Sequence, residues 1–84
     1  MTSVLCYPNP ANDRVTVQYM LHESGSVHCV VRDILGNTVE SSIQDLEHGI
    51  QAFEIDTHQL SNGIYTIELR SNVERVEAKI VIHR

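Results

Sequence analysis

The chain has 84 residues, enough for one small domain, and 42% of them are hydrophobic. Its formal net charge of -5 argues against nucleic-acid binding, which needs a basic surface. No apolar run approaches the ~20 residues that span a bilayer, and residues 1–3 do not begin a signal peptide. We therefore expect one domain at residues 4–84, cut from the end of a longer protein. Residues 1–3 would be a linker or residues added in cloning.

The hydrophobic pattern alternates with a period of two along the whole chain, and no window of helical length keeps an apolar stripe. Such alternation, rich in β-branched residues, is typical of half-buried antiparallel strands. A short apolar run at 4–7 comes first. Alternating segments follow at 15–21, 27–31, around Val39, 53–55, 65–69 and 76–82.

Turn-forming residues separate these segments at 23–26, 35–37, 48–49, 61–63 and 71–72. About seven short strands at this spacing predict an all-β, Ig-like antiparallel sandwich. We expect Phe53, the only phenylalanine, to be central to a thin core, so that its replacement by alanine costs about 3–5 kcal/mol. The expected core residues are Val17, Tyr19, Val31, Phe53, Ile55, Tyr65, Ile67 and Ile80.

Two prolines should end the first strand, because proline fixes φ and lacks a backbone donor. They flank Asn9 in the run Pro8-Asn9-Pro10, and Asp13 then offers a side-chain oxygen to the turn before the next strand. Further along, Asp33 and Gly36 bracket a predicted tight hairpin that leads into Val39.

A second motif lies at Leu60-Ser61-Asn62-Gly63-Ile64-Tyr65. It places Tyr65 at the start of a strand after a corner, where immunoglobulin-like sandwiches often use a tyrosine hydroxyl to bond back across the corner. We expect Tyr65 to stabilise the fold in this way.

The last segment differs in charge from the rest of the chain. Residues 1–69 have a formal charge of -7, whereas residues 70–84 have +2. The segment is either a solvated strand of mixed charge or a surface presented to an acidic partner. We expect Val76, Ala78, Ile80 and Ile82 to pack inward and Arg75, Lys79 and His83 to be exposed. Its outer edge, if open, could accept a partner strand or a second copy of the chain.

In their order and spacing, these motifs and the terminal run Lys79-Ile80-Val81-Ile82-His83-Arg84 resemble the C-terminal sorting domain of the bacterial type IX secretion system. The resemblance covers residues 4–84. The family often has proline before Gly-Ile-Tyr and often ends in lysine, where this chain has Ser61-Asn62 and His83-Arg84. Both departures keep the local chemistry. The residues that match the family motif are Pro8, Asn9, Pro10, Asp13, Asp33, Gly36, Leu60, Gly63, Ile64 and Tyr65.

The resemblance implies a sorting signal without cofactors. It directs an N-terminal cargo through the periplasm to an outer-membrane translocon, with a shuttle protein and a sortase as further partners. The sortase would remove the domain, with the cut at or before its start, and anchor the cargo to the cell surface. We expect the translocon to recognise the tail: Arg75, Lys79, Ile80, Val81, Ile82, His83 and Arg84. Lys79 and Arg84 are expected to be exposed, so that changing them costs little stability.

Catalytic and metal-binding arrangements find little support. Ser24, His22 and Asp33 contain the residue types of a triad, but no nucleophile-elbow glycines accompany them. His48 and His58 flank one strand with acidic neighbours, which would allow incidental metal binding at most. We expect a protein that is not an enzyme.

Two questions stay open from the sequence. A small carbohydrate-binding or adhesion module is the alternative function, although Trp is absent and Tyr7, Tyr19, Tyr65 and Phe53 are all expected to face inward. Cys6 and Cys29 lack the CxxC spacing. In an oxidising compartment they either form a disulfide or stay free.

Overall fold

The structure is a computed structural model, and it describes residues 4–8 and 13–84. These residues form seven strands and no helix, so they offer no helix that could cross a membrane. The strands are β1 (Val4–Tyr7), β2 (Arg14–Leu21), β3 (Gly25–Arg32), β4 (Thr38–Leu46), β5 (Gly49–Asp56), β6 (Gly63–Arg70) and β7 (Arg75–Ile82).

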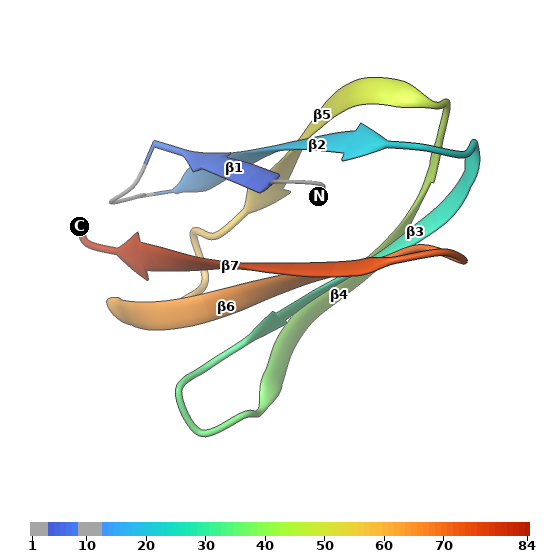
Figure 1. Ribbon diagram of the computed structural model, residues 1–84. Helices are drawn as coiled ribbons and strands as arrows, with labels where there is room; N and C mark the ends of the chain where they lie inside the picture. The colour runs from blue at the N-terminus through green and yellow to red at the C-terminus, as the bar shows by residue number, and fades with distance from the viewer. Residues whose placement is uncertain (1–3, 9–12) are drawn as a thin grey trace.

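The strands are arranged in two layers (Figure 1). One sheet has the order β1-β2-β5 and the other the order β4-β3-β6-β7, with every pair antiparallel. The chain passes between the sheets after β2, β4 and β5, whereas the β3–β4 and β6–β7 hairpins stay within the four-stranded sheet. This confirms the predicted all-β sandwich of about seven strands.

The core lies between the sheets and takes one face of each strand, as the alternation predicts. On β2, for example, Val15, Val17, Tyr19 and Leu21 are all buried. Seven of the expected core residues are buried in the structure: Val17, Tyr19, Val31, Ile55, Tyr65, Ile67 and Ile80. Leu60 and Ile82 are also buried there.

Phe53 is not central to this core, so that prediction is wrong. Its side chain is only half-buried and packs against the rim of the core. The reason is the order of the strands, because β5 lies at the edge of the three-stranded sheet and one flank of Phe53 faces solvent. The largest fully buried side chain is instead Tyr19, on the central strand of that sheet.

Tyr7 also departs from expectation. It is 45% exposed on the outer face of β1, where its hydroxyl donates a hydrogen bond to Gln18 Oε1 at 3.3 Å. Every residue of β1 is apolar or aromatic, so the sequence did not show which side of this strand faces the core. Val4 and Cys6 take the inward positions.

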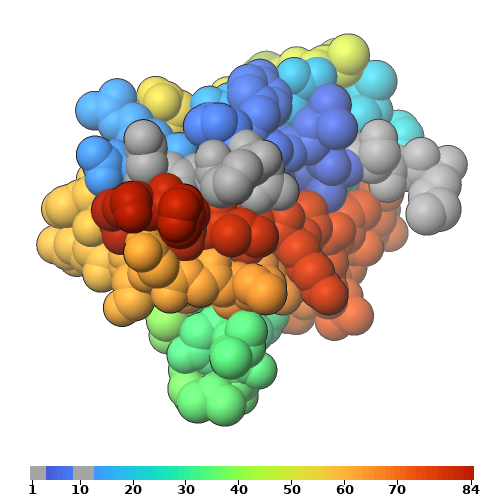
Figure 2. Space-filling model, turned by 90° about the vertical axis from the view of Figure 1, so that its left-hand side faces the viewer, coloured from blue at the N-terminus to red at the C-terminus, as the bar shows by residue number. Residues whose placement is uncertain are grey.

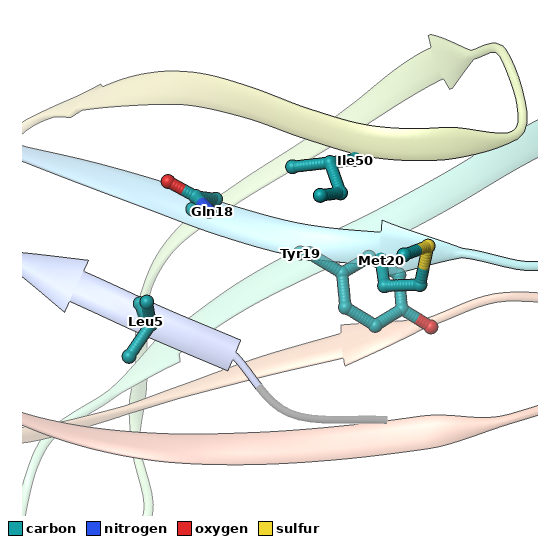
Figure 3. A pocket seen from close by; sticks show the side chains of 5 residues that line it. All are labelled: Leu5, Gln18, Tyr19, Met20 and Ile50. Atoms are coloured by element: carbon teal, nitrogen blue, oxygen red, sulfur yellow. The ribbon is translucent and has the colours of Figure 1, made fainter. Parts of the chain in front are cut away.

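One part of the outer face of the three-stranded sheet, around Met20, is apolar. Leu5, Met20 and Ile50 surround a shallow hollow of about 170 Å³ there, whereas Tyr19 belongs to the opposite, inward side (Figure 3). This apolar patch contrasts with the cluster of charges on the outer face of the four-stranded sheet that is described below.

Cys6 and Cys29 are free thiols, and no disulfide joins them. Burial raises the pKa of the Cys29 thiol to about 12, with smaller contributions from Cys6 and Glu40. Burial raises the pKa of the Cys6 thiol as well. Since the thiolate is the reactive form, both groups should be poor nucleophiles near neutral pH.

We predict two free thiols per chain when the unfolded, unreduced protein is titrated. In the folded protein at neutral pH, Cys29 should react far more slowly than in the unfolded protein, because it is buried and its thiolate is disfavoured. Recovery of fewer than two thiols without reductant would contradict the free-thiol state.

We predict that Phe53→Ala lowers the free energy of unfolding by about 1–2 kcal/mol, less than Ile67→Ala at about 2–5 kcal/mol. Ile67 is 1% exposed, whereas Phe53 is half-buried. Replacing Ile67 with alanine therefore leaves a larger buried cavity than replacing Phe53, although isoleucine is the smaller side chain. Urea denaturation of the two variants measures the difference. An equal or larger loss for Phe53→Ala would show that the edge position does not reduce its contribution.

Candidate functional site

Three segments that are distant in sequence meet at one end of the sandwich, and the side chain of Arg84 joins them. Its guanidinium donates hydrogen bonds to the backbone carbonyls of Leu60 and Thr57. Its Nε lies 3.2 Å from Asp13 Oδ1. Figure 1 places the C-terminal end beside the connection between β5 and β6, and Figure 2 looks onto this end of the molecule.

Hydrogen bonds donated by backbone N–H groups connect the same segments. The Arg84 N–H donates to Asn62 Oδ1 at 3.1 Å, and the Thr57 N–H donates to the Asp13 carbonyl at 2.8 Å. Thr57 is fully buried, and its own carbonyl accepts from the Leu60 N–H at 2.9 Å. The Arg84 side chain is therefore only 30% exposed. Arg84 is exposed as a residue, as expected, but its side chain has distant acceptors that local alternation cannot reveal, and we expect its replacement to cost more stability than an exposed position suggests.

The corner formed by Tyr65 agrees with the prediction. The Tyr65 hydroxyl donates to the Ser61 carbonyl at 2.7 Å while its ring is buried. Leu60 is buried just before the corner, and Ile64, just after Gly63, is 51% exposed on the outer face of the four-stranded sheet. The second motif thus closes the β5–β6 corner and presents Ile64 outward.

Asp33 and Gly36 build the turn between β3 and β4. The backbone N–H groups of Leu35 and Asn37 each donate to Asp33 Oδ1 at 2.9 Å. These bonds, the one from Asn37 most of all, hold the pKa of this carboxyl below its usual range. Gly36 has a φ of 88°, which favours glycine. Ile34, at the tip of the hairpin, is 78% exposed.

β7 alternates as predicted. Ile80 and Ile82 are buried in the core, whereas Arg75, Lys79 and Val81 are exposed on the outer face. His83 follows the strand and is exposed. The side chains of Ile80 and Ile82 therefore cannot reach a partner while the domain is folded.

A buried carboxylate organises the outer face of the four-stranded sheet. The Glu68 side chain is 3% exposed and lies within 3.4 Å of Arg32, 3.0 Å of Arg70 and 3.3 Å of Arg75. Such a charge is tolerated because each oxygen has a cationic donor. Sequence reasoning missed Glu68, Arg32 and Arg70, although register places Arg70 opposite both His28 and Arg75.

The remaining candidates lie elsewhere. His22 bonds Glu74 at 3.1 Å, Ser24 bonds Glu47 at 3.3 Å, and Asp33 sits in the hairpin turn, so these three residues do not converge. His58 Nδ1 lies 2.6 Å from Asp56. No group of three or more potential metal ligands occurs within residues 4–8 and 13–84.

Of the first motif, Pro8 follows β1 at the surface, and Asn9 and Pro10 lie outside the described residues. Asp13 is placed by its contacts with Thr57 and Arg84. In the described parts of the chain, Tyr7 is the one exposed tyrosine. A single exposed ring is weak support for a carbohydrate platform.

Among protein families, the model of the secretion system C-terminal sorting domain matches residues 5–83 of the chain. The chain belongs to this family. It is the C-terminal sorting signal of type IX secretion, which implies recognition by the type IX machinery and attachment to an N-terminal cargo. It also implies passage through the periplasm to the outer membrane, the cell surface or the medium. Comparison with curated proteins found no match.

We predict that Arg84→Lys lowers the free energy of unfolding of the sorting domain by about 1–2 kcal/mol, because an ammonium cannot reproduce the fork that reaches two carbonyls. Chemical denaturation measures the loss. The control is Arg14→Lys at an exposed position, which should change stability by less than about 0.5 kcal/mol. Equal effects of the two changes would contradict the role assigned to Arg84.

Proposed function

We propose that the type IX translocon recognises the folded sorting domain through the outward residues of β7 and the residue that follows it, namely Arg75, Lys79, Val81 and His83. The observation that carries this proposal is the alternation of β7. Its inward side chains anchor the strand in the core, and its outward side chains are exposed at the edge of the four-stranded sheet. A partner can therefore contact this side of the strand without unfolding the domain.

Recognition of a folded domain is favoured over recognition of an extended tail. Freeing β7 would expose Ile80 and Ile82, which are 0% and 1% exposed, at a cost of about 3–6 kcal/mol for the two side chains. It would also break the contacts of Arg84 with Thr57 and Leu60. That cost is a large share of the stability of a small domain.

The finer steps of the pathway also belong to this proposal. The N-terminal cargo folds in the periplasm and is carried to the translocon with the help of a shuttle protein. A sortase then removes the domain by cutting at or before its start, and the cargo is anchored to the cell surface.

The test fuses the domain to a reporter in a type IX-competent strain and measures the reporter at the cell surface. The variant carries Lys79→Glu and His83→Glu, both at exposed positions. We expect it to fold, by thermal melting, and to accumulate in the periplasm. The control carries Arg14→Glu and His48→Glu, which make the same charge changes at exposed positions off β7, and should reach the surface.

Surface delivery of the β7 variant at the level of wild type would overturn recognition through these residues. If the wild-type fusion also failed to leave the periplasm, the domain would not be a sufficient signal for this cargo.

A further inference from the structure

The β3–β4 hairpin projects from the body of the molecule, as the green segment in Figures 1 and 2 shows. Between this hairpin and the outer face of β6 and β7 lies an open hollow of about 480 Å³. Arg32, Thr66 and Lys79 form one cross-strand row along its floor. Ile34 and Ile64 contribute its apolar walls.

The sheet surface beside this hollow is opposite in net charge to the rest of the chain, while the hollow itself is lined by Asp33 and Glu77 as well as by Arg32 and Lys79. The outer surface of β6 and β7, with Arg32 beside it, carries Arg32, Arg70, Arg75 and Lys79, four of the six Lys and Arg residues. It carries two of the eleven carboxylates, Glu68 and Glu77. Its formal charge is therefore +2 in a chain whose total is -5.

The acidic side chains near the hollow are engaged in local contacts. Glu68 is surrounded by three arginines. Glu77 lies 3.7 Å from Arg75, and the Asp33 carboxylate accepts the hydrogen bonds of its own turn. At the floor itself, the charged side chains are those of Arg32 and Lys79, in one row with Thr66.

The apolar walls are exposed to solvent. Ile34 is 78% exposed and Ile64 is 51% exposed. The hollow therefore offers apolar contacts from Ile34 and Ile64 and ionic contacts from Arg32 and Lys79. An occupant needs a carboxylate for the floor and an apolar side chain for the walls.

We propose that this hollow binds an acidic protein segment of the secretion machinery that carries apolar side chains beside its carboxylates. The proposal rests on the proposed function and adds β3 and the hairpin to the recognition surface. A protein segment fits better than an anionic membrane. The rest of the chain has a formal charge of -7, so a flat anionic bilayer would be repelled around the hollow, whereas a short segment contacts the hollow alone.

The direct test titrates the 84-residue chain with a synthetic peptide of alternating glutamate and leucine, followed by backbone amide NMR. We expect shifts centred on Arg32, Ile64, Thr66 and Lys79, and binding that weakens as salt is raised. A peptide of alternating lysine and leucine should not bind. Shifts spread over the other sheet, or no binding of the acidic peptide, would overturn the proposal.

Matched variants decide whether the hollow is responsible. Ile34→Ser with Lys79→Glu should weaken binding of the acidic peptide by about tenfold or more. Ile50→Ser with Arg14→Glu makes the same chemical changes on the other sheet, where Ile50 is 64% exposed, and should leave binding within about twofold. Equal loss in both variants would overturn the proposal. The proposal would also be overturned if the acidic peptide did not bind but the domain bound phosphatidylglycerol vesicles, and if Ile34→Ser with Lys79→Glu abolished that vesicle binding.

The same pair of variants in the reporter strain separates this inference from the proposed function. The inference is supported if wild type and the Ile50→Ser/Arg14→Glu control reach the cell surface and the Ile34→Ser/Lys79→Glu variant stays in the periplasm. To isolate the hairpin from β7, Ile34→Ser alone should reduce delivery. If Ile34→Ser has no effect while Lys79→Glu with His83→Glu blocks delivery, the hollow is overturned and recognition through β7 stands.

Discussion

The arrangement of the motifs depends on the contacts of the Arg84 guanidinium. The guanidinium donates to carbonyls on the β5–β6 connection and contacts Asp13, which lies 71 residues earlier in the sequence. The three motif segments of the sorting domain are therefore parts of one structural unit. Charge-assisted bonds to partly buried acceptors are among the stronger polar contacts in proteins. One side chain can thus close an end of a sandwich whose core is thin.

The two faces of the four-stranded sheet have separate roles in this account. The inner face supplies Ile67, Ile80 and Ile82 to the core. The outer face concentrates cations around the buried Glu68, which holds three arginines in place at a cost in desolvation. A chain that is acidic overall thereby presents a basic surface on which β6 lies between β7 and the β3–β4 hairpin. Because β7 serves both faces, its deletion removes core packing as well as any recognition surface.

The sequence was informative wherever local pattern decides structure. Alternation and turn residues predicted the strands, and the position of Tyr65 predicted its bond to the corner. The sequence was misleading at Phe53, because burial there depends on strand order and β5 is an edge strand. It was also misleading at Tyr7, because β1 is apolar on both sides. The acceptors of Arg84 and the ligands of Glu68 come from several strands or loops. Their meeting depends on the assembled sheets, which no local spacing encodes.

Amide hydrogen exchange of the Arg84→Lys variant tests most directly whether this side chain holds the motif segments together. The account predicts that protection falls together in β7, at Thr57 and at Leu60, while the β3–β4 hairpin keeps the protection it has in the wild type. Faster exchange confined to His83 and the substituted residue would contradict it, because Arg84 would then order only the end of the chain.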